Sequence, residues 1–167
     1  LGAGERFETP EAVIAVSHDG IGGMSRAFHD AYRNHLIPKN NAFTSRPIVI
    51  NNWEATYFNF NTEKLKAIVD AVEGTGIDTF VLDDGWFGKR DNDSSGLGDW
   101  VVNEKKLDGG LKAIIDHAHS KGMKFGLWFE PEMISEDSDV FRAHPDYAIG
   151  KPNRPKCYSR KQLMMDL

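Results

Sequence analysis

The chain has little cysteine, no long apolar run and no excess of basic residues. Its single cysteine, Cys157, excludes an internal disulfide and fits a reducing compartment, so we expect a cytoplasmic protein. No apolar segment reaches the roughly 20 residues that a membrane-spanning helix needs, so no membrane contact is expected. The formal net charge is -5 and no basic stripe is present, which argues against nucleic acid as a partner.

Motifs for phosphate, dinucleotide or metal binding are also missing. No glycine-rich fingerprint links a predicted strand to a helix. His117 and His119 are two residues apart on a predicted helix, so they do not share a face. The acidic run at 91–93 lacks the closing acid of a calcium loop and predicts a solvated loop. We therefore expect no metal and no cofactor.

Length and composition allow one domain with a real core, because the chain has 167 residues and is 40% hydrophobic. Residues 1–46 predict the end of one domain and a connection to the next. A strand is expected over 11–17, followed by three nearby glycines. A helix over about 24–36 would place Met24, Phe28, Ala31 and Tyr32 on one face. The polar stretch after Pro38 predicts a linker.

Residues 47–167 alternate between strand and helix patterns. Strands are predicted over 48–53, 78–82, 124–129 and 162–167. One helix is capped by Asn61 or Thr62, and its apolar face consists of Leu65, Ile68, Val69 and Val72. A second helix follows a long polar loop at 87–106, with Asp108 as the candidate cap and Leu111, Ile114, Ile115 and Ala118 on one face. A weaker helix is expected over 137–143. This alternation predicts a parallel α/β sheet.

Chemically interesting side chains recur where the first three of these strands end. Asn52 and Trp53 follow the first strand, Asp83 and Asp84 the second, and Trp128 and Glu130 the third. A (β/α)₈ barrel keeps its active site at this end of its strands.

The predicted strands are too few for a complete barrel, because four strands cannot close one. The first residue is Leu1 rather than Met, and the last, Leu167, falls inside a predicted strand. These observations predict a piece of a longer protein.

The run at 81–88, VLDDGWFG, carries the strongest functional signal. Carboxylates accept hydrogen bonds from paired hydroxyls, and an indole stacks on the C–H face of a sugar ring. Adjacent residues of a strand point to opposite faces, so Asp83 and Asp84 reach one ligand only if the backbone turns, which Gly85 permits. The competing interpretation is a solvated turn or a helix cap. The flanking Trp86 and the barrel context favour a sugar site.

The other aromatic and acidic candidates also have two interpretations. Trp53 and Trp128 are either core aromatics or stacking walls, and their position at strand ends favours the walls. Trp86 and Trp100 fit packing or a subunit contact equally well. Residues 129–132, FEPE, have the pattern of a catalytic pair, because the spacing of Glu130 and Glu132 places both on one face of an extended segment.

Three blocks resemble the family 36 glycoside hydrolases, the large bacterial and fungal α-galactosidases. The blocks are 51–58, NNWEATYF; 82–88, LDDGWFG; and 126–133, GLWFEPEM. Residues 98–100 and 121–124 fit as well, and the resemblance covers nearly the whole chain. It implies an α/β fold, namely the first half of a (β/α)₈ TIM barrel over 47–167. It also implies the end of a β-sandwich domain and a linker helix over 1–46.

The resemblance implies retaining hydrolysis of terminal α-galactosides such as melibiose and raffinose, by a homo-oligomeric enzyme. A retaining pair of carboxyl groups lies roughly 5–5.5 Å apart. In the family the nucleophile lies in a Lys-Trp-Asp motif and the acid/base lies further along the chain. Both are therefore expected downstream of Leu167, and no catalytic residue is expected within this chain.

The resemblance also implies which residues bind the substrate. By motif position Trp53, Asp83, Asp84 and Trp128 are implied to bind galactose, with the aspartates on O4 and O6. The two glutamates of the FEPE segment are implied to order the site.

Three alternative functions stay open at this point. α-N-acetylgalactosaminidases and galactosyl-transferring synthases share much of this barrel, and the residues that contact the C2 substituent are expected downstream. The block at 51–55, NNWEA, favours a hydrolase over a synthase. The third alternative, from a different class, is a non-catalytic galactose-binding fragment.

Overall fold

A three-stranded parallel sheet lies at the centre of residues 47–167. Its strands are β1 (Val49–Asn51), β2 (Thr79–Leu82) and β3 (Lys124–Leu127), in the order β1-β2-β3. In the middle row Ile50 pairs with Phe80, and Phe80 pairs with Phe125. This computed structural model describes residues 2–41, 44–151, 153–155 and 160–166. The predicted α/β class with a parallel sheet is confirmed, whereas the half-barrel stays a prediction.

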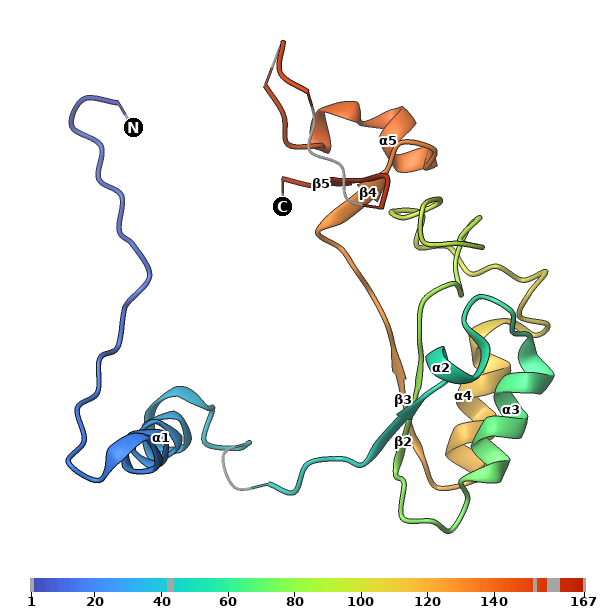
Figure 1. Ribbon diagram of the computed structural model, residues 1–167. Helices are drawn as coiled ribbons and strands as arrows, with labels where there is room; N and C mark the ends of the chain where they lie inside the picture. Colours follow the sequence, from blue (N-terminus) through green and yellow to red (C-terminus); the bar gives the residue numbers. More distant parts are fainter. Residues whose placement is uncertain (1, 42–43, 152, 156–159, 167) are drawn as a thin grey trace. The chain divides into compact units, whose positions relative to one another are not determined.

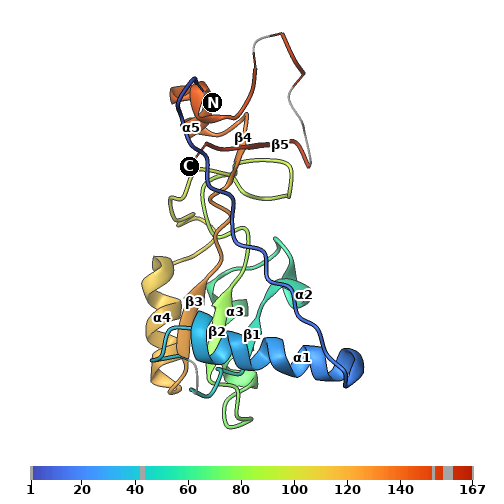
Figure 2. The same cartoon turned by 90° about the vertical axis from the view of Figure 1, so that its left-hand side faces the viewer.

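Two helices pack together on one face of this sheet (Figures 1 and 2). The first is α3 (Thr62–Ala71), which connects β1 to β2 in the chain. The second is α4 (Gly110–Ser120), which connects β2 to β3. Leu65 and Val69 of α3 and Ile114 and Ala118 of α4 are fully buried in one cluster that also contains buried side chains of β2. They are half of the predicted apolar faces, and Ile68, Val72 and Leu111 are partly buried against the same cluster. The faces could be predicted because the period of 3.6 residues is set by the helix itself.

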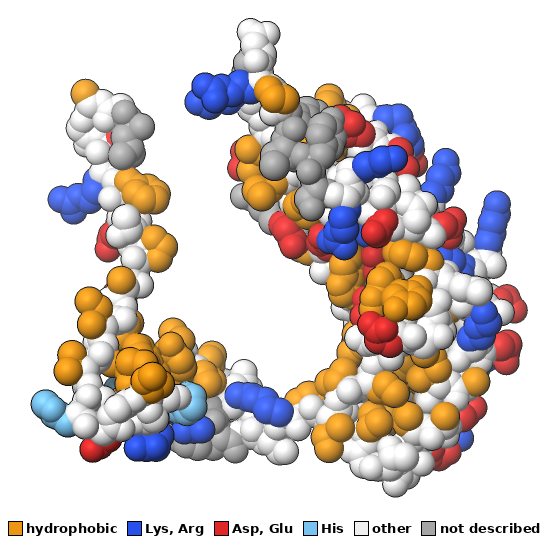
Figure 3. Space-filling view, in the orientation of Figure 1, with side chains coloured by type: hydrophobic (Ala, Val, Ile, Leu, Met, Phe, Trp, Pro, Cys, Tyr) orange, Lys and Arg blue, Asp and Glu red, His pale blue; other side chains and the backbone are white. Residues whose placement is uncertain are grey.

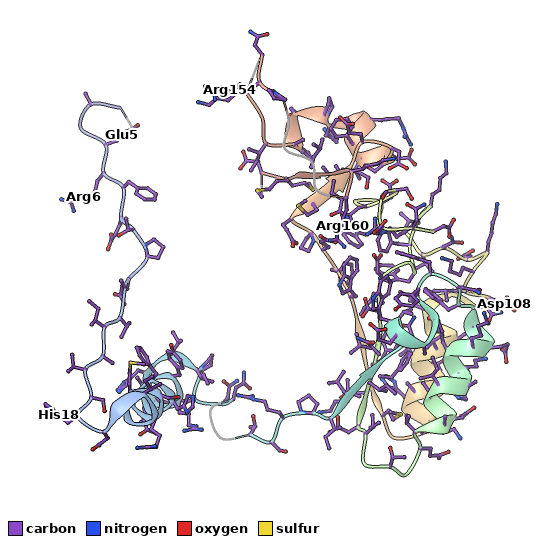
Figure 4. The ribbon with its side chains drawn as sticks, in the orientation of Figure 1. Glu5, Arg6, His18, Asp108, Arg154 and Arg160 are labelled. Carbon is purple, nitrogen blue, oxygen red and sulfur yellow. The ribbon has the colours of Figure 1, made fainter. Side chains whose placement is uncertain are left out.

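The starts of the two helices are joined by one hydrogen bond. Asn61 caps α3, since its Oδ1 accepts from the backbone N–H of Lys64 at 2.9 Å. Thr62 then donates its hydroxyl to the carbonyl oxygen of Asp108 at 2.9 Å. The predicted cap role of Asp108 is wrong, because the cap position of α4 is Gly109 and the Asp108 side chain points outward (Figure 4).

The loop from β2 to α4 is largely packed, contrary to the prediction of a polar loop. Leu97 and Leu107 are fully buried, whereas 91–93 are exposed, as the solvated-loop prediction required, together with Lys89, Val101, Glu104 and Lys105. Leu97 exchanges two hydrogen bonds with Ser135: its N–H donates to the serine Oγ at 3.1 Å, and its carbonyl accepts from the serine N–H at 2.9 Å.

The last predicted strand, over 162–167, does not extend the parallel sheet. Its described part, β5 (Gln162–Met164), instead pairs antiparallel with β4 (Met133–Ser135), with Ile134 opposite Leu163. A run of apolar residues predicts a strand but does not specify its partner, and β4 is too short to be recognised in the sequence. Between them lie α5 (Asp139–Ala143), capped by the Ser138 hydroxyl, and the 3₁₀ turn η2 (Pro145–Tyr147).

The first strand is also shorter than predicted, because the short helix α2 (Trp53–Thr56) begins where the strand was expected to end. Asn52 precedes this helix, and the backbone N–H groups of Ala55 and Thr56 donate to its carbonyl oxygen at 3.1 and 3.0 Å. Trp53 therefore lies on a helical turn just beyond the sheet rather than on a strand.

Residues 1–46 form a separate unit, which is described by itself. It contains α1 (Gly20–Ala31), continued by a π-helical turn, η1 (Tyr32–Leu36). Phe28 and Tyr32 contact each other on the predicted face, with ring centroids 5.8 Å apart. The strand predicted over 11–17 is not formed, because the unit's described residues contain no second strand to pair with it. The assignment to a β-sandwich domain stays a prediction.

Apolar side chains remain exposed on both units (Figure 3). In the first unit they include Ile14 and Val16, each 89% exposed; in the second they include Ile48, Val49 and Phe129. No helix in the described part of the chain is long and apolar enough to cross a membrane.

Candidate functional site

A tight turn directly after β2 places the two adjacent aspartates. The backbone N–H of Asp83 donates to Oδ1 of Asn52 at 2.8 Å, and the N–H of Asp84 donates to Oδ1 of Asp83 at 2.8 Å. Gly85 then has a φ of 98°, in the left-handed region. Asn52 is fully buried and also donates from Nδ2 to the Thr56 hydroxyl at 2.9 Å. Asn52 therefore ties the end of β1 to the turn after β2.

The four residues that the resemblance implied to bind galactose line one pocket, with a volume of about 350 Å³. Two further side chains also line the pocket: one follows the end of β3 in the chain, and the other precedes β5. The lining residues are Trp53, Asp83, Asp84, Trp128, Glu130 and Arg160. Figure 4 labels Arg160, which lies in this view between the parallel sheet and the β4–β5 pair. The sequence contained no signal for Arg160, because 30 residues separate it from its partner Glu130.

Asp84 is not a free carboxylate, because it forms a buried ion pair with Arg90. The guanidinium Nη2 lies 2.8 Å from Oδ2, and Nε lies 3.0 and 3.1 Å from Oδ1 and Oδ2. Arg90 is 0% exposed and Asp84 is 5% exposed. A carboxylate has about four lone-pair directions, so acceptor capacity toward the pocket is retained. Sequence reasoning missed Arg90, since an arginine in a loop of mixed charge is usually solvated.

The two tryptophans of the pocket are each supported by other rings. Trp53 is half-buried and meets Tyr57 and Phe58 edge-on, with centroids 5.1 Å away in both cases. Trp128 is half-buried and lies parallel to Phe87 at 6.5 Å, with an interplanar angle of 10°. Both rings are thus fixed while part of their surface stays accessible, which is what a stacking wall requires.

Trp86 belongs to the core rather than to the pocket. It is 2% exposed, and its indole N–H donates to the carbonyl of Trp128 at 3.0 Å. Trp100 is half-buried in the same aromatic cluster, 6.1 Å from Trp86 and 4.4 Å from Phe87 between centroids. Of the two interpretations left open for Trp86, the burial supports packing within the chain.

Glu130 and Glu132 do not form a pair in one pocket. The Glu130 side chain is 13% exposed and lies 3.2 Å from Arg160, through Oε1 and Nη2. Its Oε2 is buried and has no hydrogen-bond partner among the described residues. Glu132 is exposed and does not line the pocket, because residues 131 and 132 form a turn rather than an extended segment.

Burial raises the pKa of Glu130 above its ordinary value of 4.5, and the nearby charge of Arg160 opposes that shift. The like charges of Glu132 and Asp84 add smaller increases. The pocket thus holds one carboxyl group that is more easily protonated than an exposed glutamate.

Two residues named in the sequence predictions, Cys157 and Leu167, lie outside the described residues. The expectation that the nucleophile and the acid/base follow Leu167 therefore stays a prediction. Among the residues that the structure describes, no three His, Cys, Asp or Glu side chains gather as metal ligands.

A larger hollow, of about 490 Å³, lies between the loop at 88–102 and the start of α5. Both of its acidic residues are already engaged: the oxygens of Asp99 accept from the N–H groups of Asp139 and Val140 at 2.9 and 3.1 Å, and the Asp139 carboxylate pairs with Arg142. The smaller pocket after β2 is the better candidate, because it has three carboxylates and two indoles, whereas the larger hollow has two engaged aspartates and one indole.

Comparisons with known proteins show which structures this fold resembles. The crystal structure of the family 36 α-galactosidase AgaA from Geobacillus stearothermophilus superposes with a TM-score of 0.82. The match has 49% identity and covers 86% of this chain and 20% of AgaA. An AgaA variant in complex with 1-deoxygalactonojirimycin gives a TM-score of 0.85, at 48% identity over 90% of this chain and 21% of that one.

Sequence comparison gives the family. The profile described as Melibiase matches residues 6–167, and the chain belongs to this family. It is 48% identical over its whole length to α-galactosidase Mel36A from Lactobacillus acidophilus, and 48% identical over 166 residues to AgaA. The chain spans 23% of the length of each of these two relatives. The resemblance inferred from the three sequence blocks is therefore confirmed.

We predict that Gly85→Ala destabilises the protein more than Gly76→Ala does. Both glycines have left-handed φ values, 98° and 94°, so both substitutions add backbone strain. At Gly85 a Cβ would also lie 2.8 Å from Cδ1 of Phe58, whereas nothing lies within 4 Å of a Cβ at Gly76. Urea unfolding should give an extra loss of about 1–3 kcal/mol for Gly85→Ala. Equal losses would contradict the crowded turn.

A second prediction concerns pH and Glu130. Because its pKa is raised in the folded state, ionised Glu130 opposes folding above the ordinary pKa of 4.5. Glu130→Gln should therefore increase the free energy of unfolding at pH 7. The gain should shrink as the pH falls through the raised pKa and vanish below the ordinary pKa of 4.5, where the glutamate is protonated in both states. Urea unfolding at several pH values measures this, with the exposed Glu104→Gln as control.

Proposed function

We propose that this chain is the sugar-binding front part of an α-galactosidase. The longer enzyme hydrolyses terminal α-D-galactosyl residues from oligosaccharides such as melibiose and raffinose, with retention of configuration. The observation that carries the proposal is the pocket after β2, which gathers two carboxylates and two indole walls. Family membership supports it, as do the AgaA variants whose crystal structures are complexes with stachyose and raffinose.

The chemistry of the pocket suits a galactosyl group. Asp83 and Asp84 offer acceptors to the O4 and O6 hydroxyls, and the ring faces of Trp53 and Trp128 offer apolar surface to the C–H side of a pyranose. Galactose differs from glucose in the direction of O4. A buried acceptor left without its hydroxyl costs about 1–3 kcal/mol, so carboxylates directed at an axial O4 select galactose.

The catalytic carboxylates are proposed to come from residues of the longer enzyme beyond Leu167. The relatives are more than four times the length of this chain, because it spans 23% of them. Apolar side chains such as Val49 and Phe129, which are 50% exposed here, would then be covered by the rest of a (β/α)₈ barrel or by a second subunit. A homo-oligomer in the cytoplasm is part of the proposal, the compartment resting on the single cysteine.

Asp83→Asn should weaken galactoside turnover in the longer enzyme. The amide keeps an oxygen that can accept from the N–H of Asp84, so the turn is retained while the anionic acceptor is lost. We expect a raised KM and a fall in kcat/KM of about two orders of magnitude, from about 3 kcal/mol of lost transition-state binding. Steady-state kinetics on a chromogenic α-galactoside measures this. Asp116→Asn, on the exposed side of α4, is the matched control, and unchanged kinetics for Asp83→Asn would refute the site.

The chain of 167 residues by itself should show no turnover of the same chromogenic substrate. It lacks the nucleophile and the acid/base that retaining hydrolysis requires. The longer enzyme, assayed in parallel, is the positive control. Turnover by the chain alone, unaffected by further purification, would place the catalytic residues within it.

A further inference from the structure

Arg90 is a fully buried cation that reaches the pocket only through Asp84. Its Nε and Nη2 donate to both carboxylate oxygens of Asp84, over 2.8–3.1 Å. Arg90 does not line the pocket, whereas Asp84 does. The guanidinium therefore stands directly behind a side chain to which the proposed function gives a binding role.

The guanidinium is itself held in place by the loop that carries it. Nη1 donates to the carbonyl of Ser95 at 3.0 Å, and the Phe58 ring lies 5.8 Å from Cζ. Lys106 Nζ donates to the carbonyl of Gly85 at 3.0 Å, on the turn between Asp84 and Arg90. The packed loop thus fixes both ends of the ion pair.

Stability alone does not account for such a pair. Buried ion pairs are often replaceable by apolar side chains of similar volume without loss of stability, because two charges must be removed from water. What an arginine adds is geometry, since its planar fork contacts both oxygens of a carboxylate and fixes the plane of that group. Asp84 has its remaining acceptor capacity on the pocket side.

Charge gives a second, independent argument. Three carboxylates, from Asp83, Asp84 and Glu130, lie around one pocket of about 350 Å³. Adjacent like charges repel, and the repulsion grows as water is excluded. Arg90 balances Asp84 from behind, without occupying the space in which a ligand would lie.

We propose that Arg90 is a positioning residue for substrate binding: it orients the Asp84 carboxylate toward a substrate hydroxyl and balances its charge. The inference rests on the proposed function of the pocket. The loop after β2, which carries Arg90 outside the pocket, thereby contributes to substrate binding.

Arg90→Lys in the longer enzyme tests the inference. Lysine keeps the positive charge, so Asp84 is not left as an unpaired buried anion, but it loses the two-point contact. We expect kcat/KM on a chromogenic α-galactoside to fall at least about tenfold, mainly through KM, because a misoriented acceptor weakens binding. Arg142→Lys is the matched control, since Arg142 is exposed, pairs with Asp139, donates to the carbonyl of Asp137 and does not line this pocket.

A coupling measurement separates positioning from a purely structural role. If Arg90 acts through Asp84, the double variant Arg90→Lys/Asp84→Asn should lose about as much kcat/KM as Asp84→Asn alone. Losses that multiply would overturn the inference. If Asp84→Asn does not fold, the KM of Arg90→Lys decides alone: a lower thermal midpoint with wild-type KM means that Arg90 only stabilises the fold, and the inference fails.

The Asp83→Asn variant distinguishes the two proposals. Arg90 does not contact Asp83 in any hydrogen bond of the described residues, so this variant reports on the pocket without the ion pair. A loss in Asp83→Asn with none in Arg90→Lys would reject the role of Arg90 and leave the sugar site standing. No loss in Asp83→Asn would reject the sugar site itself.

Discussion

The turn after β2 is the constraint on which the rest of the site depends. It is held from two sides: the Asn52 amide accepts from the backbone of Asp83, and the Arg90 guanidinium fixes the side chain of Asp84. Two adjacent residues can then face one pocket although strand geometry would separate them, because Gly85 reverses the backbone at once. Without these supports two neighbouring carboxylates would repel each other and turn toward water.

The elements that were predictable are those whose signal is local. The helices α3 and α4 follow from apolar residues at intervals of three and four, and β2 follows from a short apolar run that ends in acids. Strand partners are not local information. The segment at 162–164 therefore formed an antiparallel pair with β4, and the segment at 11–17 remained without a partner among the described residues of its unit.

The residues of the candidate site also fall into those that could be predicted from the sequence and those that could not. Trp53, Asp83, Asp84 and Trp128 were predictable because the ends of parallel strands meet at one edge of a sheet, so residues far apart in sequence converge there. Arg90 and Arg160 were not, because each reaches its carboxylate from an irregular loop whose path no periodicity describes. The sequence thus indicated which residues would face a ligand but not which residues would hold them there.

The balance of charges in the pocket limits what it can bind. Arg90 is engaged on both sides, since it donates to Asp84 and to the Ser95 carbonyl, and Arg160 lies against Glu130. Asp83 therefore faces the pocket without a cation of its own among the described residues. Such a surface attracts hydroxyl donors and repels phosphate or carboxylate groups, which would meet acceptors rather than donors. A neutral, hydroxyl-rich ligand with an apolar ring face satisfies both the acids and the indoles, whereas the phosphate of a sugar phosphate would be repelled by the acids.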